Sequence, residues 1–107
     1  MPRLATITDS IDVLLDRIAS GERPQRERLE ETLTDGYAFA LRLDAVCARL
    51  ERRISTQTER LAEGSSEESA RELSALARRL TCHRRERDAL RARLSVLQAG
   101  VRQARVA

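Results

Sequence analysis

The spacing of apolar residues constrains the fold of this 107-residue chain more than any other feature. From Leu29 to Leu61, alternating steps of four and three land on apolar or small residues except at Gln57. The same stepping from Leu73 to Val101 lands on apolar residues except at His83 and Arg87. Such sustained spacing is typical of a coiled-coil seam. The seam positions predicted in this way are Leu29, Leu33, Gly36, Ala40, Leu43, Cys47, Leu50, Ile54, Leu61, Leu73, Leu76, Leu80, His83, Leu90, Leu94, Leu97 and Val101.

The two stripes mirror each other about a turn near residues 64–66, where Gly64 and the following serines are typical of a chain reversal. If the chain folds back there, Leu50 faces Leu80 and Gly36 faces Leu94, and on the flank Asp44 falls beside Arg84. The pattern therefore predicts an all-α fold built on a long antiparallel helical hairpin.

Local signals divide the chain into three helices within a single domain, residues 1–107. Thr8, Asp9 or Ser10 can cap a short first helix that Gly21 ends, and Pro24 suits the first position of the next helix. The predicted helices span about 10–20, about 24–63 and about 67–105, with the turn at 64–66.

Two further local signals concern the long helices. Ser65 or Ser66 can cap the last helix. Asp35-Gly36 is a strong turn signal, but the apolar stripe passes through it without a shift in phase. We therefore expect a continuous helix through Gly36, with a break as the alternative.

Residues 37–48, YAFALRLDAVCA, are apolar on more faces than one seam can cover. The first helix could cover part of this segment, which gives a three-helix bundle; a second copy of the chain could cover the rest, which gives a dimeric four-helix-type bundle. We expect self-association, with a monomeric bundle as the alternative. The residues predicted at this protein interface are Tyr37, Phe39, Leu41, Val46, Ile11 and Leu15.

The net charge of +3 conceals an asymmetry, because residues 71–107 carry ten arginines against three acidic residues. Arg71, Arg78 and Arg85 repeat every seven residues, so they follow one line of a helix and could contact phosphates. Aromatic residues, which would stack on bases, do not interleave with them. Non-specific nucleic-acid binding is one alternative function.

The predicted hairpin tip is acidic, with Glu63, Glu67 and Glu68 beside the turn. An antiparallel coiled coil with an acidic tip resembles, in shape alone, the factors that insert into the secondary channel of RNA polymerase. Regulation of transcription by such insertion is the second alternative. Acidic residues at a helix N-terminus also simply favour the helix dipole.

Residues that could carry chemistry are few. Cys47 and His83 share a predicted layer and Cys82 is adjacent, but the spacings of a structural zinc site are missing, so we expect no metal and no cofactor. Phosphate-binding loops and hydrolase motifs are also missing from the sequence, and we expect no enzymatic activity.

Apolar runs long enough to span a bilayer and a signal-peptide pattern are absent from the sequence as given. We therefore expect a cytoplasmic protein with reduced thiols. The function predicted from the sequence is a non-enzymatic helical-hairpin module for protein–protein interaction, such as an adaptor, chaperone or small regulatory subunit, that self-associates through residues 37–48.

Overall fold

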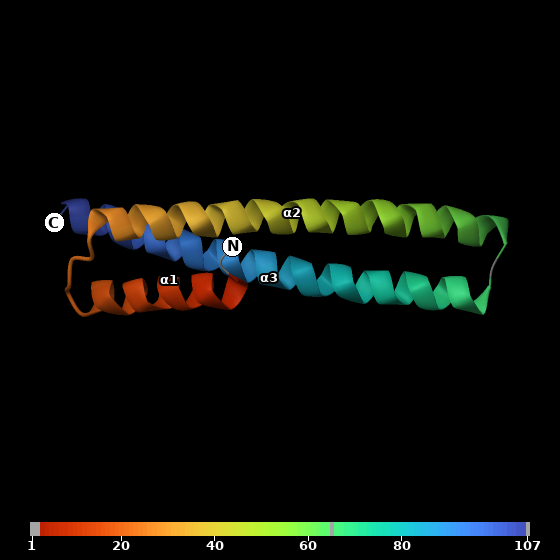
Figure 1. Ribbon diagram of the computed structural model, residues 1–107, viewed down its shortest axis with the longest axis horizontal. Helices are drawn as coiled ribbons and strands as arrows, with labels where there is room; N and C mark the ends of the chain where they lie inside the picture. The colour runs from red at the N-terminus through yellow and green to blue at the C-terminus, as the bar shows by residue number, and fades with distance from the viewer. Residues whose placement is uncertain (1–2, 65, 107) are drawn as a thin grey trace. The chain divides into compact units, whose positions relative to one another are not determined.

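The computed structural model describes residues 3–64 and 66–106, and these residues form three helices (Figure 1). Helix α1 spans Leu4–Ala19, α2 spans Arg26–Glu63 and α3 spans Glu67–Val106. No strand occurs in the described residues. The predicted all-α fold, with two long helices after a short one, is confirmed.

The chain divides into two compact units, which are described separately below. Unit 1 contains the chain up to Leu41 together with the chain from Asp88 onward, and unit 2 contains Arg42–Arg87. Helices α2 and α3 each contribute to both units, whereas α1 belongs to unit 1 alone.

Helix α1 begins at Leu4, well before the predicted start near residue 10, and its N-cap residue is Arg3. The prediction that Thr8, Asp9 or Ser10 caps this helix is wrong, because all three residues lie inside it. The physical reason is an apolar stripe that starts earlier: Ile7 is buried with Ile11 and Leu14 on one face. Burial of that face stabilises the helix more than an N-cap at residues 8–10 would.

Helix α1 ends as predicted, at a glycine. Gly21 has a φ of 84°, in the left-handed region that glycine adopts without strain. The amide of Glu22 donates to the carbonyl of Arg17, and the amide of Gly21 donates to that of Ile18, each at 3.0 Å. This pair of hydrogen bonds is the Schellman motif, which satisfies carbonyls that the helix end would leave unpaired.

Helix α2 begins at Arg26, so the prediction that Pro24 takes its first position is wrong. The carbonyl of Gln25 accepts the first intrahelical hydrogen bond, from the amide of Leu29, at 3.1 Å. It runs without interruption through Asp35 and Gly36. The continuous helix expected at Gly36 is confirmed, and the alternative of a break is excluded. Gly36 is buried against the side chain of Leu94.

The core of unit 1 brings together all three helices. Its buried side chains come from α1 (Ile7, Ile11, Leu14), from α2 (Thr32, Ala40) and from α3 (Leu90, Leu94, Leu97). On α3, Gly100 packs beside Ile18 of α1, and a Cβ there would lie 3.6 Å from that side chain, at ordinary contact distance. The Tyr37 hydroxyl donates a 2.8 Å hydrogen bond to Gln98, which joins α2 to α3 close to the contact between Gly36 and Leu94.

The core of unit 2 is a two-helix seam. Cys47 and Leu50 of α2 are buried with Leu76 and Leu80 of α3, and Val46 and Ile54 pack against this cluster. Taken over both units, the predicted seam positions are all buried or half-buried. The same alternation of steps therefore describes the inner faces of α2 and α3 in each unit.

The reversal between α2 and α3 follows the predicted turn. Helix α2 ends at Glu63 and α3 begins at Glu67. The Ser66 hydroxyl oxygen accepts a 3.1 Å hydrogen bond from the amide of Ser69, as an N-cap does. Ser65, the other predicted cap, lies outside the described residues.

Candidate interaction surfaces

The first candidate surface lies on α2 in unit 1, around Leu41. The Leu41 side chain is 64% exposed, more than Val13 (48%) or Val96 (57%), the two other large apolar side chains exposed among the described residues. Ala38, one turn before it, is also exposed. Helix α1, predicted as a partial cover for this segment, therefore leaves Leu41 uncovered.

The remaining residues of the predicted protein interface are buried to different degrees. Ile11 has no exposed surface, so the prediction that it lies at an interface is wrong: its side chain fills the unit 1 core. Tyr37, Phe39 and Leu15 are half-buried in unit 1, and Val46 is half-buried against the unit 2 core. Most of the large apolar side chains in residues 37–48 are thus at least half-buried by contacts within the chain itself.

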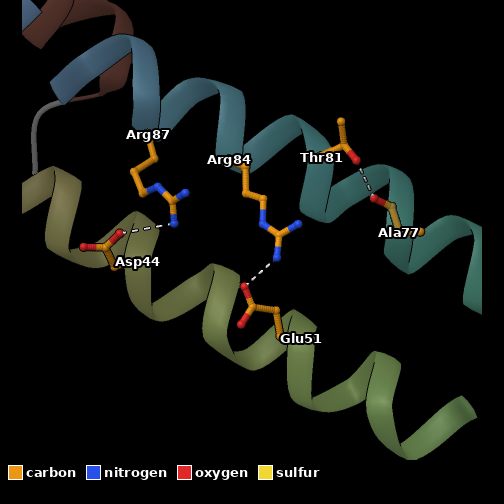
Figure 2. A network of polar contacts seen from close by, with 6 residues as sticks. All are labelled: Asp44, Glu51, Ala77, Thr81, Arg84 and Arg87. Atoms are coloured by element: carbon orange, nitrogen blue, oxygen red, sulfur yellow. Dashed lines mark hydrogen bonds and ion pairs between the residues drawn. The ribbon is translucent and has the colours of Figure 1, made fainter. Parts of the chain in front are cut away.

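Two ion pairs connect α3 to α2 on the flank of unit 2 (Figure 2). Arg84 lies 2.8 Å from Glu51, and Arg87 lies 3.5 Å from Asp44. The predicted placement of Asp44 beside Arg84 is wrong by about one turn, because Arg87 occupies that position. These pairs are partly exposed, and each stabilises the fold by about 1 kcal/mol or less.

The arginines predicted as phosphate contacts differ in their surroundings. Arg71 forms a 3.1 Å ion pair with Glu67 in the preceding turn. Arg78 and Arg85 are exposed and line a shallow depression on α3, together with Cys82 and Glu86. Two of the three therefore remain available, and a carboxylate lies beside them.

A second basic surface, on α2 in unit 2, was missed by the sequence analysis. Arg49, Arg52, Arg53 and Arg60 are exposed and line one shallow depression with Thr56 and Gln57. None of the four guanidinium groups is paired with a carboxylate of the described residues. The spacing of these arginines signals this surface in the sequence, but the excess of arginine in residues 71–107 is the stronger charge signal.

The acidic residues of the predicted tip are exposed and close to the turn. Glu67 and Glu68 lie in the first turn of α3, and Glu63 is the last residue of α2. Glu67 pairs with Arg71, and Glu72, one turn further along α3, accepts a 2.9 Å hydrogen bond from Gln57. Part of the acidic charge is therefore used to stabilise the ends of the helices.

The two cysteines and His83 lie in different environments. Cys47 is buried in the unit 2 core, whereas Cys82 is exposed, and both are free thiols. The Cys82 thiol donates to Glu86 at 3.3 Å; this hydrogen bond and the carboxylate charge raise the pKa of Cys82 above its ordinary value. The Nδ1 atom of His83 has no hydrogen-bond partner in the described part of the chain and lies 3.9 Å from Glu86.

Across residues 3–64 and 66–106, no group of three His, Cys, Asp or Glu side chains is placed to hold a metal ion. The described helices also include none that combines the length and apolar character needed to cross a membrane. Comparison with known proteins finds no matching family model, no significantly similar curated protein and no significantly similar solved structure.

Proposed function

We propose that this protein is a non-enzymatic helical module that works by binding other proteins, and that it self-associates through α2 around Ala38 and Leu41. The observation that carries the proposal is the exposure of Leu41, which remains 64% accessible on a helix whose inner face is buried. The exposure of Leu41 supports an interface centred on Ala38 and Leu41, which is narrower than the whole of residues 37–48.

The geometry at Leu41 suits packing against a second helix. Covering a leucine side chain contributes about 1.5–3 kcal/mol, and in a twofold-symmetric dimer each copy contributes the same residues. Ala38 has a small side chain, so it lets a partner helix approach α2 closely. Tyr37 and Phe39, both half-buried, would border the contact.

The proposed role is that of an adaptor, chaperone or small regulatory subunit. The surfaces described above are helix faces rather than enclosed sites, and faces of this kind suit recognition of another helix. The two arginine surfaces and the acidic tip belong to unit 2, whereas Leu41 belongs to unit 1.

The proposal is tested by measuring the mass of the protein in solution by light scattering over a range of concentrations. We expect a dimer that Leu41→Glu converts to a monomer, because a charge cannot be buried unpaired at an apolar contact. Val96→Glu is the matched control: it introduces the same charge at a residue of similar exposure on α3, and it should leave the dimer intact.

Two results would contradict the proposal. The wild-type protein could remain monomeric at the highest concentration measured, or Leu41→Glu and Val96→Glu could weaken association equally. Helical content measured by circular dichroism should be unchanged in both variants, because both positions are largely exposed.

A further inference from the structure

Unit 2 carries a basic surface that neither the fold nor the proposed self-association requires. Arg49, Arg52, Arg53 and Arg60 lie on α2, away from the seam residues Leu50 and Ile54, and their guanidinium groups lack carboxylate partners in the described ranges. Four unpaired, exposed arginines on one helix face attract anions, because each carries a full charge and five donors in a planar fork.

The spacing of this surface matches a row of phosphates. At 3.6 residues per turn the four arginines fall within an arc of about 100°. Arg49 and Arg60 are eleven residues apart, which is about 16 Å along the helix. One strand of a duplex places a phosphate about every 3.4 Å along its axis, so the stripe follows about five phosphates.

The chemistry of unit 2 favours a duplex over a single strand or a membrane surface. Residues 42–87 contain no Phe, Tyr or Trp, so the unit lacks the aromatic platforms on which single-stranded bases stack. The exposed large apolar side chains among the described residues are Val13, Leu41 and Val96, none of which belongs to unit 2. A membrane-bound amphipathic helix needs such side chains to insert into the bilayer.

We propose that the arginine face of α2, formed by Arg49, Arg52, Arg53 and Arg60, binds the phosphate backbone of double-stranded nucleic acid without sequence specificity. The contacts centre on Arg49, Arg52 and Arg53, because Glu59 and Glu63 lie near Arg60 and repel phosphate. Glu51 does not oppose binding in the same way, since its carboxylate pairs with Arg84 at 2.8 Å.

The test is the binding of a short, fluorescently labelled DNA duplex of mixed sequence to the full chain, followed by fluorescence anisotropy as a function of salt. If four arginines contact phosphates, raising the salt from about 50 to 200 mM should weaken the affinity for the duplex on the order of 100-fold. Arg49→Gln/Arg52→Gln/Arg53→Gln should reduce the slope of log affinity against log salt by about 3. A second duplex of unrelated sequence should bind equally well.

Three comparisons make the result specific to α2. The lysine variant Arg49→Lys/Arg52→Lys/Arg53→Lys keeps the charge, so it should keep most of the salt slope. The charge-matched variant Arg23→Gln/Arg28→Gln/Arg102→Gln removes three exposed arginines of unit 1 and should bind nearly as tightly as the wild type. Arg78→Gln/Arg79→Gln/Arg85→Gln removes three exposed arginines of α3 and should reduce the slope less than the α2 variant.

Several outcomes would overturn the proposal. The absence of binding to the duplex at about 50 mM salt would contradict it. An equal loss of duplex affinity in the α2 variant and in the unit 1 variant would also contradict it. Tighter binding to a single strand of equal charge would show that stacking, and not the duplex backbone, is recognised. Binding to vesicles that contain phosphatidylserine, with none to the duplex, would identify a membrane surface as the partner. Circular dichroism of each variant checks that α2 remains helical, which exposed Arg→Gln changes should not disturb.

Discussion

Replacing Gly36 by alanine should destabilise this protein, although alanine is the better helix former. In a helix interior, Gly→Ala alone is favourable by about 1 kcal/mol. At position 36, however, an added Cβ would overlap the Cδ2 atom of Leu94 and lie 3.3 Å from both its Cδ1 and Cγ atoms. Leu94 has no exposed surface, so its side chain cannot move outward.

The magnitude follows from the competition between these two effects. Overpacking a closely packed core costs about 1–3 kcal/mol, which exceeds the gain in helix propensity of about 1 kcal/mol. We expect Gly36→Ala to lower the free energy of unfolding by about 1 kcal/mol. For a chain of this size that loss corresponds to a fall in Tm of about 4 °C.

Gly100 provides the matched control, because it also lies inside a helix of unit 1. A Cβ there would lie 3.6 Å and 3.7 Å from Cγ2 and Cδ1 of Ile18, which is ordinary van der Waals contact. Gly100→Ala should therefore raise the free energy of unfolding by up to about 1 kcal/mol. Urea denaturation followed by circular dichroism measures both changes.

A double-mutant cycle locates the cause. Leu94→Val shortens the side chain that Gly36 faces, so combining it with Gly36→Ala should cost less than the sum of the two single changes, by about 0.5 kcal/mol or more. The reasoning is refuted if Gly36→Ala stabilises the protein as much as Gly100→Ala does, or if Gly36→Ala and Leu94→Val are additive.

Two further predictions concern side-chain hydrogen bonds in unit 2. Ser66→Ala removes the hydroxyl that caps α3 and should lower the free energy of unfolding in urea by about 1 kcal/mol; an unchanged midpoint would show that the cap contributes nothing. Glu86→Gln removes the carboxylate that raises the pKa of the Cys82 thiol. The pKa should fall, so the thiolate fraction and the rate of alkylation by iodoacetamide at pH 8 should rise. Glu59→Gln, remote from this thiol in sequence, should leave the rate unchanged, and an equal rate in both variants would contradict the assignment of Glu86.

The long helices and the turn between them were predictable because their signals are local and repeat many times. The seam spacing recurs from Leu29 to Leu61 in α2 and from Leu73 to Val101 in α3, so one ambiguous dipeptide such as Asp35-Gly36 cannot outweigh it. Gly21 and Ser66 were predictable for a related reason, since each acts through backbone groups within a few residues.

The start of α1 could not be predicted from local signals, because the N-cap residues are a stronger signal there than the apolar one. Thr8, Asp9 and Ser10 are good N-cap residues, but the buried Ile7 precedes them. The core of unit 1 supplies the energy that carries the helix past its local caps. Such tertiary stabilisation is invisible to reasoning from helix propensity and caps alone.

The side-chain pairs on the flanks could not be predicted from the register. The mirror register placed Arg84 beside Asp44, yet Arg84 reaches Glu51 and Arg87 takes the place beside Asp44. Arginine side chains are long and flexible, so partners one turn apart are almost equally accessible. The local packing of α2 on α3 selects between them.

The sequence by itself determined the helical class, the turn at 64–66 and the continuity of α2 through Gly36, because periodicity and caps act over short distances. Only the tertiary structure decided which side chains of the apolar segment 37–48 are buried and which are exposed. Packing in the two units buries Ala40, Leu43 and Cys47 and leaves Leu41 64% exposed. Equally apolar residues in one helix differ in this way because burial depends on what packs against each face, and a linear pattern does not specify that.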